Sequence, residues 1–168
     1  MKNVLRAGRV ISGMAIVMAL GAGVSWSGGP AMRVQTTGSH RPAGRPNAKW
    51  ISLSAIDKIA RGDRILYHVQ IMNQGDRAAK IPVAVGPIPL GTAYVPGTAT
   101  RTKNVDVQFS IDGGRTFSPS PAVALSSKDG KRRILSAPPE RYTTVRWRWD
   151  TPLPVGAKAV VSYQVQVR

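Results

Sequence analysis

Residues 65–72, "ILYHVQIM", place an apolar side chain at every second position. Ile65, Tyr67, Val69 and Ile71 form this apolar set. A period of two directs all four side chains to one face of an extended chain. The stretch therefore predicts a half-buried β-strand whose apolar face rests on a hydrophobic core.

The same period recurs further along the chain, at 105–111, 145–149 and 161–167. Shorter apolar pieces lie at 81–85 and 121–125. Turn-forming residues separate these runs: "NQGD" at 73–76, "GPIPLG" at 86–91, "DGG" at 112–114, "KDG" at 128–130 and "PVG" at 154–156. About seven strands at roughly 10-residue spacing predict an all-β protein, an immunoglobulin-like antiparallel β-sandwich.

The first 27 residues have the layout of a secretory signal peptide. Three basic residues begin it: Lys2, Arg6 and Arg9. Residues 10–24 are apolar and uncharged, and the small residues Ser25 and Ser27 follow on either side of Trp26, so we expect a mature chain that begins near Gly28. Two alternatives stay open: cleavage after Ala31, or retention of the segment as an anchor, although its apolar run is shorter than the ~20 residues that span a bilayer. We expect the protein to be exported, to the periplasm or the extracellular surface.

Residues 28–48 contain several Pro and Gly residues and no acidic residue. Their apolar content is too low to bury a core. The sequence therefore predicts a flexible, disordered basic leader at 28–48, followed by the folded domain at 49–168.

Positive charge is the strongest compositional feature, with 24 Lys and Arg against 8 Asp and Glu. Without the three basic residues of the signal peptide the balance is 21 against 8, a net charge of +13. Such an excess favours acidic polymers or anionic surfaces as partners. A charged surface that serves only solubility explains it equally well.

Several motifs occur in an order that resembles a known family. They are Gly62-Asp63, Asn73-x-Gly75, "PLGTAY" at 89–94, "FSIDGGRTF" at 109–117, "YTTVRW" at 142–147, and a close from Pro154 to Val167. Together they resemble the bacterial and archaeal conserved repeat domain, domain of unknown function eleven, in an exported single-copy form. The resemblance covers roughly residues 50–168 and implies an immunoglobulin-like sandwich in an exported, cell-surface or envelope protein. It implies no chemistry, and Gly86 stands where the family usually has Asp.

The stretch "SIDGGRTF" also fits the Asp-box of sialidases and related sugar-cleaving propellers. In a propeller this motif repeats once per blade, and a chain of 168 residues is too short for several four-stranded blades. We therefore interpret it as a structural hairpin, in which Asp112 accepts backbone N–H bonds, a glycine supplies positive φ and the aromatic ring packs beneath. The residues of this predicted hairpin are Ser110, Asp112, Gly114, Thr116 and Phe117.

No combination of residues predicts catalysis, a cofactor or a metal site. Cysteine is absent, His40 and His68 belong to different segments, and Glu140 is the only Glu. The Asp residues lie mostly beside Gly or at strand ends, whereas sugar hydrolysis needs two convergent carboxylates. We therefore predict that the protein is not an enzyme and binds no cofactor or metal.

The remaining candidate site is a basic surface. Arg146 and Arg148 share the outward face of a predicted strand, and Lys131, Arg132 and Arg133 belong to a predicted loop. With the leader, these residues would bind the backbone of a polyanion in a salt-sensitive way.

The sequence therefore favours a non-catalytic structural or adhesive module of the cell surface, periplasm or extracellular matrix. Envelope or matrix components, acidic polymers or further copies of the chain are the expected partners. The alternative is a polyanion-binding protein that takes nucleic acid, lipopolysaccharide or acidic polysaccharide. An enzyme is the third alternative.

Overall fold

The computed structural model describes residues 29–56, 58–126 and 132–168, and the predicted signal peptide lies outside this range. The described chain is nearly all β-structure, with short 3-10 helices at Leu53–Ala55 and Pro139–Arg141. Its strands are β1 (Met32–Arg41), β2 (Ile51–Ser52), β3 (Arg64–Asn73), β4 (Val83–Pro87), β5 (Thr92–Tyr94), β6 (Val105–Ser110), β7 (Ala122–Ser126), β8 (Arg132–Ser136), β9 (Thr144–Trp149) and β10 (Lys158–Val167). No helix among these residues is long and apolar enough to cross a membrane.

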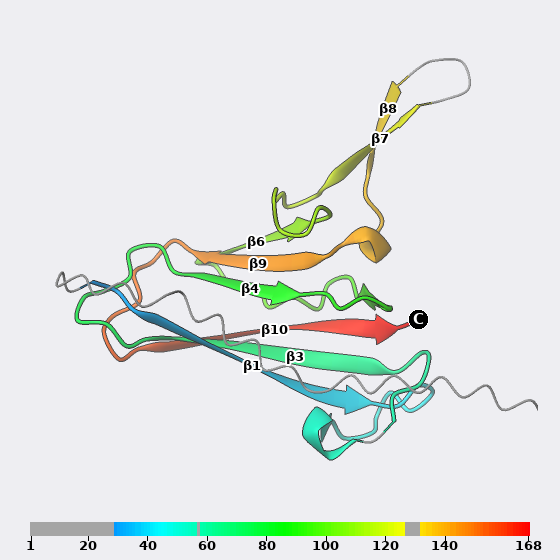
Figure 1. The fold of residues 1–168 in the computed structure, drawn as a ribbon, viewed down its shortest axis with the longest axis horizontal. Coiled ribbons are helices and arrows are strands. Elements are labelled where there is room, and N and C mark those ends of the chain that lie inside the picture. Colours follow the sequence, from blue (N-terminus) through cyan, green and yellow to red (C-terminus); the bar gives the residue numbers. More distant parts are fainter. Residues whose placement is uncertain (1–28, 57, 127–131) are drawn as a thin grey trace, which may run out of the picture.

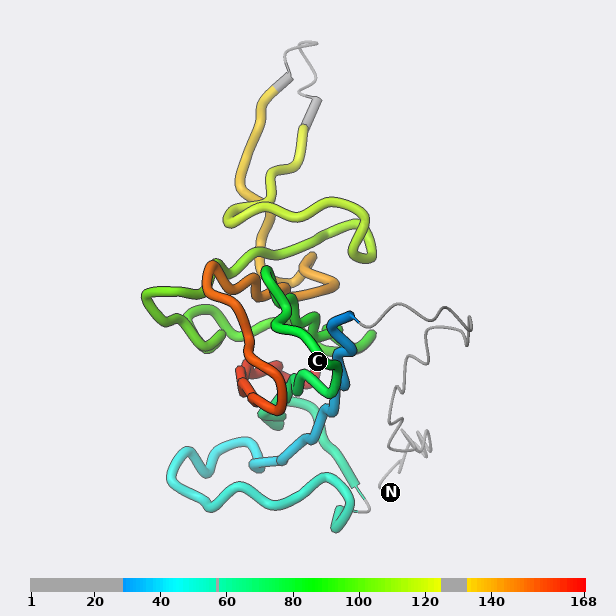
Figure 2. The backbone as a smooth tube through the Cα atoms, turned by 90° about the vertical axis from the view of Figure 1, so that its left-hand side faces the viewer, coloured from blue at the N-terminus to red at the C-terminus, as the bar shows by residue number. Residues whose placement is uncertain are grey.

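The strands form two sheets and one separate hairpin (Figure 1). The five-stranded sheet has the order β2-β1-β3-β10-β5, and the three-stranded sheet has the order β4-β9-β6. Every strand pairing is antiparallel. Strands β7 and β8 pair with each other and project away from the two sheets (Figures 1 and 2). The predicted all-β antiparallel sandwich is thus confirmed.

The hydrophobic core lies between the two sheets. The five-stranded sheet contributes Val69 and Tyr163, and the three-stranded sheet contributes Val145 and Trp147, all fully buried. The rings of Trp147 and Tyr163 lie 5.6 Å apart, and the Trp147 indole N–H donates to the Thr100 carbonyl at 3.1 Å. The alternating apolar residues of the sequence therefore form the inner faces, as the period of two predicts.

The prediction of a disordered leader at 28–48 is wrong, because residues 32–41 form strand β1, which pairs with β3 along its whole length. The segment is polar because β1 lies near the edge of the wider sheet, where even the inward Val34 is 44% exposed. Backbone hydrogen bonds to β3 hold β1 in place. The segment is therefore ordered even though its apolar content is low.

The residues that precede β1 also belong to the fold. The Ala31 carbonyl accepts a hydrogen bond from the Gln74 N–H at 2.7 Å. A Cβ on Gly75 would lie 2.2 Å from the Gly29 carbonyl oxygen, so the turn after β3 fits closely against residues 29–31. This close approach explains the glycine of the Asn73-x-Gly75 motif.

Candidate functional site

Strand β9 presents Arg146 and Arg148 on the outer face of the three-stranded sheet, opposite the buried Trp147. Arg146 Nε donates to Gln108 Oε1 on β6 at 3.1 Å, and its guanidinium lies 4.0 Å from the centre of the Phe117 ring. These contacts leave the Arg146 side chain half-buried. The predicted shared face is confirmed, but Arg146 has fewer donors free for a ligand than the sequence suggests.

Arg148 is the more accessible of the two arginines. Its side chain is 55% exposed, and its Nη2 atom lies 3.6 Å from Asp106 Oδ2. An ion pair of this length and exposure contributes little to stability. Arg148 remains a candidate contact for an anion, with one carboxylate beside it that lowers the local positive charge.

The structure does not place Arg132 and Arg133 of the predicted loop beside the β9 arginines. Lys131 lies outside the described residues. Arg132 and Arg133 belong to strand β8, where the Arg133 side chain is exposed. Because the β7–β8 hairpin projects away from the sheets (Figure 1), this strand does not extend the outer face of β9.

The hairpin predicted around Asp112 forms as expected. Asp112 Oδ1 accepts hydrogen bonds from the N–H groups of Arg115 and Thr116 at 3.1 and 2.9 Å, and the Thr116 hydroxyl donates to Oδ2 at 2.6 Å. Ser110 Oγ donates to Asp112 Oδ1 at 2.6 Å and accepts from the Gly114 N–H at 2.8 Å. The hydrogen bonds from Ser110 and Thr116 hold the pKa of Asp112 well below its usual range.

The glycines of this hairpin confirm the prediction, and the Phe117 ring lies against it: a Cβ on Gly114 would be 3.6 Å from Phe117 Cζ. Gly113 and Gly114 have φ of 76° and 88°, in the region that favours glycine. Phe117 is half-buried, not buried, and lies beneath the Arg146 guanidinium. Phe109 faces the core and pairs with Ser118, so the neighbouring Phe117 must point to the outer face.

A second aspartate joins β3 to the segment that precedes it. Asp63 is buried and accepts hydrogen bonds from the N–H groups of Ala43 and Ala60 at 2.8 and 2.7 Å, and from His40 Nε2 at 2.8 Å. Burial acts to raise the pKa of Asp63, but these hydrogen bonds outweigh it and hold the pKa below its ordinary value. The sequence did not predict this cluster, because His40 was assigned to the leader.

Asn73 performs a similar task at the other end of β3. Its side chain is fully buried, and Nδ2 donates to the carbonyls of Arg77 and Leu153 at 2.7 and 3.0 Å. Its Oδ1 accepts from the Gly75 N–H at 3.0 Å. The Asn-x-Gly motif therefore joins two loops through backbone groups.

The position of Gly86 leaves no room for a larger side chain. A Cβ at residue 86 would lie 2.5 Å from the ring of Tyr163, whose hydroxyl donates to the Pro87 carbonyl. Tyr163 is fully buried and cannot move aside without disturbing the core. An aspartate at this position is therefore incompatible with the tyrosine.

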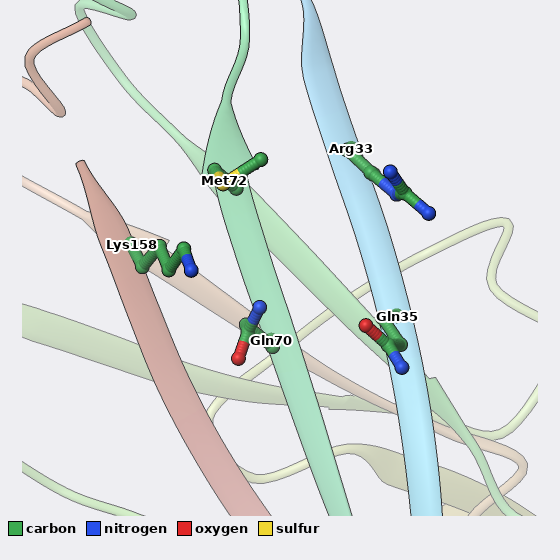
Figure 3. Close-up of a pocket in the computed structure, with 5 residues that line it drawn as sticks. All are labelled: Arg33, Gln35, Gln70, Met72 and Lys158. Atoms are coloured by element: carbon green, nitrogen blue, oxygen red, sulfur yellow. The ribbon is translucent and has the colours of Figure 1, made fainter. Parts of the chain in front are cut away.

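The outer face of the five-stranded sheet holds a shallow hollow that the sequence did not predict. Its lining comes from three adjacent strands, β1, β3 and β10 (Figure 3): Arg33, Gln35, Gln70, Met72 and Lys158. In β3 and β10, the residues that line the hollow alternate with the predicted core residues, so the period of two in the sequence predicts that they face outward. The contribution of β1 could not be predicted, because its residues were assigned to the leader.

A second hollow lies where β6 begins and β9 ends. Its lining is mixed: Ile81, Lys103, Val105, Asp106, Arg148, Trp149 and Asp150. Two basic and two acidic side chains meet there, so the charges favour neither anions nor cations. Among the described residues, no group of three or more His, Asp or Glu side chains is placed to hold a metal ion.

No family model, curated protein or solved structure matches the chain. The resemblance to the conserved repeat domain therefore rests on the motif residues alone and stays a prediction.

Proposed function

We propose that the chain is a non-catalytic, exported module with a structural or adhesive role at the cell surface, in the periplasm or in the extracellular matrix. One observation carries the proposal: the polar motif residues Asp63, Asn73 and Asp112 direct their side chains to backbone groups. These three side chains, of types that often serve in catalysis, instead stabilise turns and the connections between strands. The outer faces of the two sheets, mainly polar but with exposed valines at Val83, Val85 and Val160, remain for contact with a partner.

The described N-terminal residues support cleavage near Gly28 over cleavage after Ala31. Cleavage after Ala31 would remove the carbonyl that accepts from Gln74, together with the residues that fit against Gly75. Cleavage near Gly28 would keep both contacts. We expect mass spectrometry of the exported protein to give a mature N-terminus near residue 28, and an intact Met1 on a membrane-bound form would contradict this.

Adhesion can be measured in cells that lack the chain and in cells that regain it. We expect the chain in the envelope or medium, and we expect loss of the gene to reduce cell–cell or cell–matrix attachment. Re-expression should restore attachment. A chain confined to the cytosol, or attachment that is the same with and without it, would overturn the proposal.

Polyanion binding is the second candidate, favoured by the exposed cations on the outer faces of both sheets. On the three-stranded sheet, Arg148→Ser should reduce affinity for an anionic polymer without loss of stability, because its one ion pair is exposed. Arg146→Ser should also lower stability, because Arg146 contacts Gln108 and Phe117. Titration of heparin, DNA and lipopolysaccharide at about 50 and 200 mM salt tests the candidate, since counterion release makes such binding salt-sensitive. Absence of binding at the lower salt concentration would contradict it.

A further inference from the structure

The outer face of the five-stranded sheet is basic and carries no acidic residue on β1, β3 or β10. The outward positions of these strands include Arg33, Arg41, Arg64 and Lys158. None of the four takes part in an ion pair with another described residue. Positive charge without nearby carboxylates attracts anions to this face.

Two of these cations flank the hollow of Figure 3. Arg33 on β1 and Lys158 on β10 both lie opposite Met72 on the central strand β3. Two strand spacings separate their Cα atoms, which is about 10 Å. Gln35 and Gln70 lie opposite each other in the next row on the same face.

The chemistry of this hollow matches a charged sugar. The Arg33 guanidinium and the Lys158 ammonium form charge-assisted hydrogen bonds with carboxylate or sulfate oxygens. The amides of Gln35 and Gln70 both donate and accept, as sugar hydroxyl groups also do. Met72 adds an adaptable apolar surface against which the C–H face of a sugar ring can pack.

The face continues beyond the hollow to a second basic position. Arg41 and Arg64 lie opposite each other, eight residues along β3 from Met72, which is about 26 Å in a strand. Arg41 is partly engaged, because it donates to the Pro46 carbonyl and lies 4.1 Å from the Trp50 ring centre. The outward rows between the two basic positions contain no Lys, Arg, Asp or Glu.

We infer that this face binds an acidic polysaccharide, with Arg33, Lys158, Gln35 and Gln70 as its main contacts; the inference rests on the polyanion-binding candidate. The uncharged middle rows suit a polymer in which neutral hydroxyl-rich groups lie between charges. A nucleic acid carries a phosphate at every nucleotide. Single strands also need aromatic side chains for base stacking, and the outward positions of β1, β3 and β10 provide only the His68 imidazole and no Phe, Tyr or Trp.

The test compares two double variants that remove the same charge. In Arg33→Gln/Lys158→Gln, both cations of the hollow are lost. In the matched control, Lys80→Gln/Arg115→Gln, two exposed cations outside this face are lost. Thermal unfolding of both variants checks that the fold is kept, as expected for exposed side chains.

Binding is measured with hyaluronan, in which a neutral sugar alternates with each uronic acid, and with neutral dextran and single-stranded DNA, at about 50 and 200 mM salt. The wild type should bind hyaluronan more tightly than DNA of equal charge, and should not bind dextran. The hollow variant should weaken hyaluronan binding about tenfold, and the control about twofold or less, since only the former removes direct charge-assisted contacts. Gln70→Leu should also weaken binding, but without a change in the salt dependence.

Three outcomes would overturn the inference: equal losses in the two double variants, tighter binding of DNA, or no effect of Gln70→Leu. If the wild type binds DNA but not hyaluronan, the polyanion candidate stands and the acidic polysaccharide is wrong. If it binds no polymer, both are wrong, while the adhesive proposal is still judged by the attachment experiment.

Discussion

Two aspartates stabilise turns in this protein, one beside a strand of each sheet, and they do so with different partners. Asp63, just before β3, is buried and bonds to His40 and Ala43, which lie 23 and 20 residues away. Asp112, just after β6, is exposed, and its partners all lie within four residues. The buried carboxylate joins distant segments, whereas the exposed one shapes its own loop.

The difference shows that the number of hydrogen bonds does not decide how much a residue stabilises a fold. Loss of the Asp112 carboxylate would leave its donors close to water, which can replace the missing acceptor. Loss of the Asp63 carboxylate would leave part of its donors buried and unsatisfied, and such groups are costly. We therefore expect replacement of Asp63 to lower the free energy of unfolding much more than replacement of Asp112, although the residue type is the same.

The largest effect is expected for Asp63→Ala. The substitution removes the acceptor for Ala43, Ala60 and His40, so we expect the free energy of unfolding to fall by roughly 2–4 kcal/mol. Urea unfolding monitored by tryptophan fluorescence measures the loss. Asp76→Ala is the matched control, because Asp76 is exposed in a turn. Equal stability of the two variants would contradict the role given to Asp63.

Substitution by asparagine separates the two sites more sharply. At Asp63, Ala43 donates to one carboxylate oxygen, and Ala60 and His40 donate to the other, so an amide –NH₂ must face a donor. We expect Asp63→Asn to lose roughly 2 kcal/mol. At Asp112, one oxygen accepts most of the bonds, and the Thr116 hydroxyl can turn to accept from the amide.

Asp112→Asn should therefore keep most of the wild-type melting temperature. Calorimetry of both asparagine variants gives the comparison directly. If Asp112→Asn melts as early as Asp63→Asn, the exposed site is not the more tolerant one.

The contrast also explains what the sequence could predict. Asp112 was identified because its partners lie in the same eight-residue stretch, where spacing alone fixes the geometry. The core faces of β3, β9 and β10 were identified because a period of two is a local property. In each case the information needed lies within a few residues.

The structure differs from the prediction where distant segments meet. Strand β1 is polar and is stabilised by its pairing with β3. No local sequence pattern within 32–41 predicts this pairing. His40 and Asp63 became partners only through that pairing. Arg33 and Lys158 lie on either side of β3 for the same reason, so the basic hollow was missed and the candidate site was placed on Arg146, Arg148 and residues 131–133.

A smaller effect is expected at Phe117, which links the Asp112 hairpin to the outer face. Because the ring is half-buried, Phe117→Ala should cost roughly 1–2 kcal/mol, less than the ~3–5 kcal/mol of a buried aromatic such as Phe109. A double-mutant cycle with Arg146→Ala should give a coupling energy of roughly 0.5–1 kcal/mol for the cation–π contact. A coupling energy of zero would show that the ring and the guanidinium act independently.

The smallest effect concerns Asp112 and its dependence on pH. Its pKa is lowered in the folded protein by the hydrogen bonds from Ser110 and Thr116, relative to an ordinary value of 3.8. A lowered pKa means that the folded state favours the ionised carboxylate, so its contribution to stability is present above about pH 4 and is lost as the pH falls toward the folded-state pKa. The wild type should therefore be more stable than Asp112→Ala at pH 7, and the difference should shrink steadily from about pH 4 to pH 2. Acid also strengthens repulsion among the many basic residues, but this affects both proteins equally and cancels in the difference. Urea unfolding of the pair at several pH values measures it, and a difference that stays constant down to pH 2 would show that the carboxylate charge plays no part in stabilising the hairpin.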